Sequence, residues 1–224
     1  MKEAKETGKP AATLRRTGGR ERQREETRSA VIEAAIGLFA QRGFDGTSLP
    51  AIAQASGVPV PLTMYHFKSK EGLWREAVAT VYARVEAHIG GYAAELERAE
   101  GIAFYRVAAT AHITALAAHP EYMRMLFQEG TQNSERLAWL VEHHQSRLTA
   151  MQIAILARAQ SEGLVPPMDL GHAKFLVSGA FSLPFVLAPE YRIVTGEDSQ
   201  SPEFIERHVE ACLRLVLPAA FPKH

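Results

Sequence analysis

The sequence predicts an all-α fold with two parts, a small N-terminal domain of three helices and a larger helical domain after it. Apolar residues recur every three or four positions in one segment after another, as they do on the buried face of an α-helix. Glycine and proline separate these segments, at places where helices commonly begin and end. No segment alternates apolar and polar residues as a half-buried strand would, and no internal repeat is visible in the sequence.

The composition is typical of a folded protein with its own core. The chain has 224 residues, 46% of them hydrophobic, which is enough for one large domain or two small ones. A single cysteine, Cys212, excludes a disulfide framework and a cysteine-rich zinc site, and its helical surroundings favour a buried apolar role. The charged N-terminus does not resemble a signal peptide, and no apolar run approaches the length of a membrane span. We therefore expect a cytoplasmic protein with no membrane partner.

Charge is distributed unevenly, although the formal net charge of the whole chain is zero. Residues 1–75 contain thirteen Lys and Arg against eight Asp and Glu, a net charge of +5, and residues 76–224 carry −5. A basic N-terminal part on a mildly acidic body indicates a polyanionic partner for the first part only.

Residues 1–24 are predicted to form a flexible basic arm, because they are rich in charge and contain almost no large apolar side chain. Arginines are concentrated where this arm joins the first helix: Arg15, Arg16, Arg20, Arg22, Arg24 and Arg28. Two interpretations remain open. The arm is either a solvated tail or a segment that follows a phosphate backbone or enters a minor groove.

Residues 25–72 are predicted to form the N-terminal domain, beginning with a helix that ends at Gly43. Ser48 is a good N-cap for a second helix, and Pro50 falls in its first turn, where the missing N–H is not needed. After a turn at Gly57, prolines at the start of a third helix occupy another permitted position. Two short helices around a glycine turn are what a helix-turn-helix requires.

Residues 73–224 are predicted to form the second, entirely helical domain. Ser69 caps the helix that leads into it, and Gly90-Gly91 is expected to bend or fray that helix. Further helices are expected at about 101–118, 120–129, 134–162, 169–188 and 203–217. The last two are the best candidates for a four-helix contact between two copies of the chain. Their apolar residues include Phe175, Leu176, Phe181, Phe185, Phe204, Leu213 and Val216.

With these elements placed, part of the chain resembles the N-terminal domain of the TetR-type (TetR/AcrR) transcriptional repressors. The shared pattern is Gly43-Phe44-x-Gly46-Thr47-Ser48-x-x-x-Ile52-Ala53-x-x-Ser56-Gly57-Val58, then Tyr65-His66-Phe67-Lys68-Ser69-Lys70-Glu71-x-Leu73. It covers about residues 28–75, and the remainder matches only in length and helical character. The resemblance implies a homodimer that binds a double-stranded DNA operator through one helix-turn-helix per subunit. It also implies a C-terminal domain whose small-molecule effector alters DNA affinity.

The resemblance assigns DNA contacts residue by residue. Ser48 matches a hydroxyl that contacts phosphate, and Lys70 matches a contact made just after the recognition helix. Tyr65 and His66 match contacts made by the recognition helix itself. The residues expected to bind DNA are Arg28, Ser48, Pro59, Val60, Pro61, Leu62, Thr63, Tyr65, His66, Lys68 and Lys70.

The expected recognition helix departs from the family at its exposed front. Met64 stands where a tyrosine is common, Leu62 where threonine is frequent, and Pro50 where many members have a basic or polar residue. Residues 59–63 contain no Arg, Asn or Gln, so bidentate reading of guanine or adenine is not expected. Apolar contact with thymine methyl groups remains, and either Leu62 or Thr63 could instead face the domain core.

No enzyme signature accompanies this pattern. Metalloprotease, nucleophile-elbow, phosphate-loop and dinucleotide motifs are absent, and the adjacent His143 and His144 face different sides of a helix. We therefore expect no catalytic residue, metal or cofactor. Side chains that could enclose an effector pocket are Phe104, His112, Met123, Phe127, Trp139, His143, Phe175, Phe181 and Phe185. Most are also ordinary core candidates, and His112 is either a core histidine or a polar anchor in an apolar cavity.

Three functions remain open. The favoured one is a ligand-responsive dimeric regulator, a repressor, whose effector is an uncharged or weakly polar aromatic or lipidic molecule, because no cluster of like charge is present. The second is a DNA-binding factor of the same fold without a small-molecule effector. The third is an all-α enzyme or carrier with a vestigial N-terminal domain, against which Ser48, Tyr65, His66 and Lys70 argue. A cavity within residues 101–217 would separate the first two, and the sequence does not show one.

Overall fold

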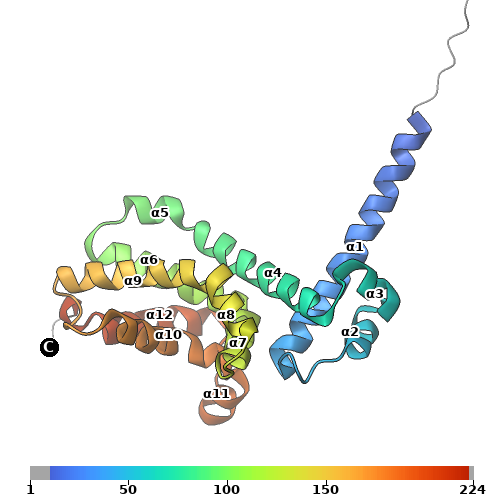
Figure 1. Ribbon diagram of the computed structural model, residues 1–224. Helices are drawn as coiled ribbons and strands as arrows, with labels where there is room; N and C mark the ends of the chain where they lie inside the picture. Colours follow the sequence, from blue (N-terminus) through green and yellow to red (C-terminus); the bar gives the residue numbers. More distant parts are fainter. Residues whose placement is uncertain (1–10, 222–224) are drawn as a thin grey trace, which may run out of the picture.

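The computed structural model describes residues 11–221, and the side chains from residue 19 onward. These residues form twelve α-helices, one π-helical turn and one 3-10 turn, and they contain no strand. Figure 1 shows a head formed by α1 to α3, an elongated body formed by the later helices, and α4 running from one to the other. The predicted all-α fold class is confirmed.

The head consists of α1 (Ala11–Arg42), α2 (Leu49–Ser56) and α3 (Val60–Phe67). Its core is closed by apolar side chains from all three helices, among them Val31, Phe39, Ile52 and Phe67, which are at most 5% exposed. The first residues of α4 (Lys70–Gly90) complete this core, since Leu73 and Trp74 are buried against it. The boundary expected between residues 72 and 73 therefore lies inside the first turns of α4, which both domains share.

The first helix is longer than its composition suggests. It begins at Ala11, so the expected flexible arm is helical over residues 11–24, and residues 1–10 lie outside the described part of the chain. Alanine, arginine, glutamine and glutamate are good helix formers, and Arg22 pairs with Glu26 one turn later at 3.0 Å. These local preferences outweigh the two adjacent glycines at positions 18 and 19. Figure 1 shows the extension projecting beyond the head, past α3.

The body contains eight of the described helices. They are α5 (Ala93–Arg98), α6 (Gly101–Ala118), α7 (Pro120–Gly130), α8 (Glu135–Leu140), α9 (Ser146–Ser161), α10 (Leu170–Val186), α11 (Ala188–Thr195) and α12 (Pro202–Val216). The five helices expected here are present with small shifts at their ends. The one expected at 134–162 is interrupted by a π-helical turn at Val141–Gln145, and the short helices α5 and α11 had no counterpart in the sequence pattern.

The central helix of the body is α6, which packs against α4, α10 and α12. By length and composition α6, with a mean hydropathy of 1.2, is apolar enough to cross a bilayer, and α10 and α11 meet the same criterion together as a pair bent by 77°. Tyr105, Ala109, Ile113 and Leu116 of α6 are nevertheless buried in the core of the body. A helix surrounded by other helices is apolar on most sides for that reason alone.

One flank of the body is formed by α10 and α12, which lie against each other. The His208 Nε2 atom of α12 is 3.3 Å from the Phe181 carbonyl oxygen of α10. Cys212 is buried between these helices, and its burial raises the pKa of the thiol to about 11. Most of the residues expected to contact a second copy, namely Phe181, Phe185, Phe204 and Leu213, are buried within this flank. Phe175, Leu176 and Leu183 on α10 and Leu215 on α12 remain exposed, and we call them the outer α10–α12 face.

Candidate nucleic-acid interface and ligand cavity

The turn between α2 and α3 has the geometry of a helix-turn-helix. The Ser48 hydroxyl oxygen accepts the Ala51 N–H at 3.3 Å, which caps α2 and leaves the O–H free to donate outward. Gly57 ends α2 with φ at 70°, a left-handed conformation in which an L side chain would be strained. Val58 then enters the core, and α3 begins at Val60 with proline in its first turn.

The exposed side of α3 is apolar and aromatic. Leu62 is 41% exposed and Tyr65 61% exposed, with Pro61 beside them at the surface. Thr63 is fully buried, and its hydroxyl donates to the Pro59 carbonyl oxygen at 3.3 Å. The expectation that Thr63 contacts DNA is therefore wrong, because its side chain faces the domain core. Of the two residues that could have faced the core, Leu62 is the one left outside.

Two lysines follow α3. Lys68 ends the helix with φ at 67°, and its ammonium donates to the Tyr65 carbonyl oxygen at 3.1 Å. Lys70 is the first residue of α4, and its ammonium lies 4.3 Å from the centre of the Phe44 ring. Both positive charges are held near the exposed end of α3 by these contacts, where a phosphate group could pair with them.

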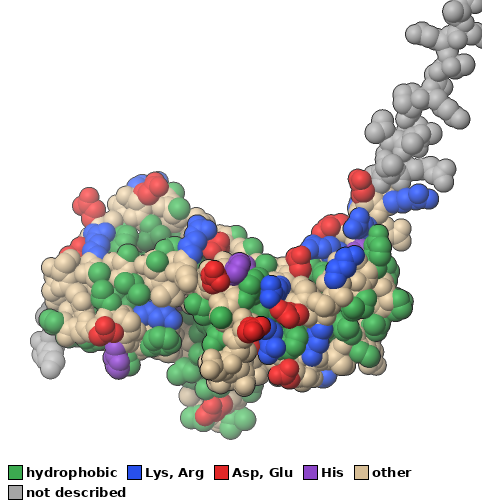
Figure 2. Space-filling model, viewed as in Figure 1, with side chains coloured by type: hydrophobic (Ala, Val, Ile, Leu, Met, Phe, Trp, Pro, Cys, Tyr) green, Lys and Arg blue, Asp and Glu red, His purple; other side chains and the backbone are tan. Residues whose placement is uncertain are grey.

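Basic residues of α1 lie beside the same end of α3. The Arg24 guanidinium is 6.0 Å from the centre of the Tyr65 ring, and Arg28 pairs with Glu76 at 2.8 Å. Burial lowers the pKa of His66, and the charges of Arg24 and Arg28 lower it further, so the imidazole is neutral at pH 7. Figure 2 shows that Lys and Arg side chains on the head are interspersed with Asp and Glu. The Glu76 carboxylate neutralises part of the positive charge of Arg28.

The head and the body meet at an aromatic junction made of Phe44, Trp74, Arg136 and Trp139. The Arg136 guanidinium from α8 lies 4.0 Å from the centre of the Phe44 ring and pairs with the buried Glu129 at 3.2 Å. The Trp74 and Trp139 rings are 5.8 Å apart, centre to centre. Trp139 and His143, both expected in the effector pocket, lie at this junction, where their rings stack 5.0 Å apart.

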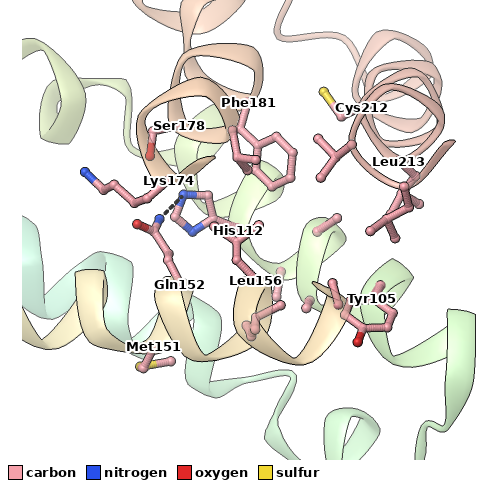
Figure 3. A pocket seen from close by; sticks show the side chains of 18 of the residues that line it. Tyr105, His112, Met151, Gln152, Leu156, Lys174, Ser178, Phe181, Cys212 and Leu213 are labelled. Carbon is pink, nitrogen blue, oxygen red and sulfur yellow. Dashed lines mark hydrogen bonds between the residues drawn. The ribbon is translucent and has the colours of Figure 1, made fainter. Parts of the chain in front are cut away.

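The body contains a cavity bounded by α6, α9, α10 and α12 (Figure 3). Its volume of about 120 Å³ compares with roughly 10–15 Å³ needed for one water molecule on the same measure. The lining is overwhelmingly apolar, with Tyr105, Leu156 and Leu213 among its residues. The space is therefore suited to an organic molecule rather than to water.

Two of the nine expected pocket residues, His112 and Phe181, line this cavity. Met123 and Phe185 are packed in the core, and Phe104 is covered by the Arg158 guanidinium at 4.3 Å. Phe127 lies at a separate surface hollow between α1, α7 and α10, and Phe175 is exposed. Helical spacing identified apolar residues correctly as a class, but it could not tell which of them border an empty space.

A small polar group interrupts the apolar lining. The Gln152 amide nitrogen is 3.3 Å from His112 Nε2, and Lys174 and Ser178 of α10 border the same region. Burial lowers the pKa of His112 to about 4, with a further contribution from the nearby Lys174 charge. Gln152, Lys174 and Ser178 were not anticipated. The available signal was a lone lysine between Ala173 and Phe175 in an apolar helix.

The lowered pKa of His112 makes stability depend on pH. Between pH 6.5 and about 4, the unfolded chain binds a proton on this imidazole that the folded protein does not, so the unfolding free energy falls as pH drops through this window. The expected loss from His112 alone is about 3 kcal/mol. Urea denaturation of the His112→Gln variant from pH 7 to 4 should show a correspondingly shallower decline. Equal declines in the variant and the parent protein would contradict this assignment.

Comparison with known proteins agrees with this geometry. Residues 31–77 match the family model described as "Bacterial regulatory proteins, tetR family". The HTH-type transcriptional regulator RutR of Escherichia coli strain K12 is 24% identical over 210 residues, covering 94% of this chain and 98% of that protein. The probable HTH-type transcriptional regulator YttP of Bacillus subtilis strain 168 is 40% identical over 73 residues, about a third of each chain (33% and 32%).

A solved structure shows that the similarity of fold extends beyond the head. The ketosteroid transcriptional regulator KstR2 of Mycobacterium tuberculosis superimposes with a TM-score of 0.64 at 17% identity. The match covers 85% of this chain and 94% of that one, so it includes the helices of the body. These similar proteins are transcriptional regulators and not enzymes, as the absence of enzyme motifs in the sequence led us to expect.

Proposed function

Because the chain belongs to the TetR family of transcriptional regulators, we propose that it is a ligand-responsive dimeric repressor that binds a palindromic operator in the cytoplasm. As a member of this family it carries a helix-turn-helix DNA-binding domain. The observation that carries the finer proposal is the position of the cavity. It is lined by the same helical run, residues 135–161, that contacts the head at the junction.

The DNA-binding residues of this proposal form three groups. Leu62 and Tyr65, with the flanking Pro59, Val60 and Pro61, present the base-reading surface of α3. Ser48, Lys68 and Lys70 contact phosphate groups beside it. His66 and Arg28 support these contacts from the adjoining helix faces, and Thr63 is excluded by its burial.

The second copy of the chain is proposed to pack on the outer α10–α12 face. One helix-turn-helix covers only half of an operator, so two heads related by a twofold axis are needed for a palindrome. Two apolar side chains of α10 are well exposed, Phe175 at 73% and Leu176 at 57%. The exposed large apolar side chains on the described part of the head are Leu62 and Tyr65. Burying them against a second copy would remove a large apolar patch from water.

The ligand response is proposed to act through α8, the π-helical turn and α9. The Gln145 side chain in the π-helical turn accepts hydrogen bonds from Tyr82 of α4 at 2.8 Å and Tyr122 of α7 at 3.0 Å. Gln152 and Leu156 border the cavity farther along the same run, and Trp139 contacts Trp74 at the other end. A ligand that displaces α9 would therefore shift α4 and the head attached to it.

A DNA-binding factor of the same fold without a small-molecule effector is the second candidate function. It accounts for the head equally well, but it gives no role to an apolar cavity with a polar group at one wall. A cavity of this size costs packing free energy, which argues for retention by a ligand-binding role.

Selection from random duplex DNA tests the proposed operator. The full-length chain should enrich an inverted repeat whose half-sites are rich in thymine where α3 docks, because Pro61 and Leu62 contact methyl groups and give guanine no hydrogen-bond donor. A Leu62→Ala, Tyr65→Ala protein serves as the matched control, and it should enrich no sequence. Half-sites dominated by G·C base pairs, or enrichment of a single unrepeated site, would contradict the proposal.

A further inference from the structure

The polar group in the cavity lies at one end of an otherwise apolar space. Figure 3 shows His112, Gln152, Lys174 and Ser178 gathered on one side, and Tyr105, Cys212 and Leu213 on the other. A ligand that satisfies both ends must therefore be amphipathic, with one polar head and an apolar body.

The Gln152 amide is half satisfied. Its nitrogen contacts His112 Nε2, and its oxygen is buried without a hydrogen-bond partner in the described part of the chain. A buried amide atom without a partner costs free energy, which a ligand head group within reach would recover. Because a glutamine amide can turn over by 180°, it can offer the ligand either the oxygen or the NH2 group.

Lys174 determines the charge of that head group. The residue as a whole is 9% exposed, and among residues 19–221 no carboxylate pairs with its ammonium. The ammonium lies against the ring of Phe175, a residue that is 73% exposed, with the ring centre 4.2 Å away. An ammonium without an anion loses part of its hydration at this partly buried place, and burial accordingly lowers the pKa of Lys174. An anionic ligand would supply the missing charge.

A single negative charge fits better than two. Lys174 is the one cationic side chain among the residues lining the cavity, since burial keeps His112 neutral at pH 7. A phosphate or dicarboxylate would bring a second charge against an apolar lining that has no second cation to pair it. A carboxylate needs one ammonium and a few hydrogen-bond donors, which Gln152 and Ser178 can provide.

We propose that the cavity binds an amphipathic monocarboxylic acid, with its carboxylate on Lys174 and Gln152 and its apolar chain or ring system against Tyr105, Leu156 and Leu213. This inference rests on the ligand-binding role proposed above and names the chemical class of the effector. It replaces the uncharged or weakly polar molecule that the sequence suggested, because the burial of one lysine could not be read from the sequence.

Direct binding to the full-length protein tests the proposal by titration calorimetry without DNA. Decanoate and 4-phenylbutanoate are the acidic probes with a chain or a ring, and decan-1-ol and 4-phenylbutan-1-ol are their uncharged counterparts. At least one acid should bind about tenfold or more tightly than its alcohol. Lys174→Met should abolish this preference while Lys174→Arg largely keeps it. Arg42→Met removes an exposed cation at the end of α1, far from the cavity lining in the sequence, and is the matched control; it should bind like the parent protein.

Binding of neither acid, equal affinity for acid and alcohol, or an unchanged preference in Lys174→Met would overturn the proposal. A preference for decanoate over 4-phenylbutanoate identifies a chain-bearing acid, and the reverse identifies a ring-bearing one. Operator affinity with and without the bound acid is measured separately. Lys174-dependent binding that leaves operator affinity unchanged would support the acid site and refute the effector role. Release of DNA by an alcohol but by neither acid would support the effector role of the cavity and refute the acid site.

Discussion

Replacing Leu176 and Leu183 together by glutamate should convert the protein to a monomer and lower operator affinity by on the order of a hundredfold or more. Both side chains lie on the outer α10–α12 face, 57% and 45% exposed, where glutamate does not disturb the core of one chain. In a dimer four carboxylates would meet at a contact that excludes water, which opposes association strongly. The second head then no longer binds the same operator, and its contribution to affinity is lost.

The matched control places the same two charges elsewhere on the body. Ile102 and Met168 are 37% and 39% exposed and lie outside the outer α10–α12 face, so their replacement by glutamate should leave both mass and affinity unchanged. Phe175 is left intact in both proteins because its ring contacts the Lys174 ammonium at 4.2 Å. Light scattering and operator titration at fixed salt provide the readouts. A Leu176→Glu, Leu183→Glu protein that remained dimeric with parental affinity would refute this interface.

Removing residues 1–24 should weaken operator binding by about tenfold or more at moderate salt. The segment contains eight Lys and Arg against three Glu, and its last part lies beside α3, where Arg24 approaches Tyr65 at 6.0 Å. Its helical part, residues 11–24, would follow the phosphate backbone next to the groove that α3 enters. The buried side chains of α1 begin at Val31, so the truncated head keeps its core and should fold normally.

Two comparisons calibrate the truncation. Lys70→Ala removes one charge near phosphate, so it should weaken binding to all sequences and reduce the salt slope by about one phosphate contact. A protein that lacks residues 1–10 alone shows how much of the loss in operator affinity comes from these ten residues and how much from residues 11–24. A truncated protein with an unchanged dissociation constant and salt slope would show that the extension does not take part in DNA binding.

The head could be predicted almost completely because its signals are local. A serine cap, a glycine turn and prolines in first turns fix where each helix begins and ends, whatever the rest of the chain does. Which side of a short helix faces inward is less local. The sequence predicted equally for Leu62 and Thr63 that the side chain could face the core or the DNA. The structure buries Thr63, the more polar of the two, and its hydroxyl is satisfied there by the Pro59 carbonyl oxygen.

The body could be predicted as helices but not as a site. A cavity depends on how helices that are far apart in the sequence pack together. His112, Gln152 and Cys212 line the same cavity although they are 40 to 100 residues apart. Periodicity gives the apolar face of each helix and no information on which faces leave space between them. The segment from Ala11 to residue 24 was wrongly predicted to be flexible. It is too polar to build a core, but it still forms a helix through its own backbone hydrogen bonds.

The number of protein copies on one selected operator tests the central claim most directly. Native mass spectrometry of the full-length chain with a duplex containing the enriched inverted repeat should show two copies per duplex. A duplex with one half-site scrambled should bind far more weakly and yield no stable two-copy complex. One copy bound equally well to both duplexes would contradict a dimeric operator-binding regulator.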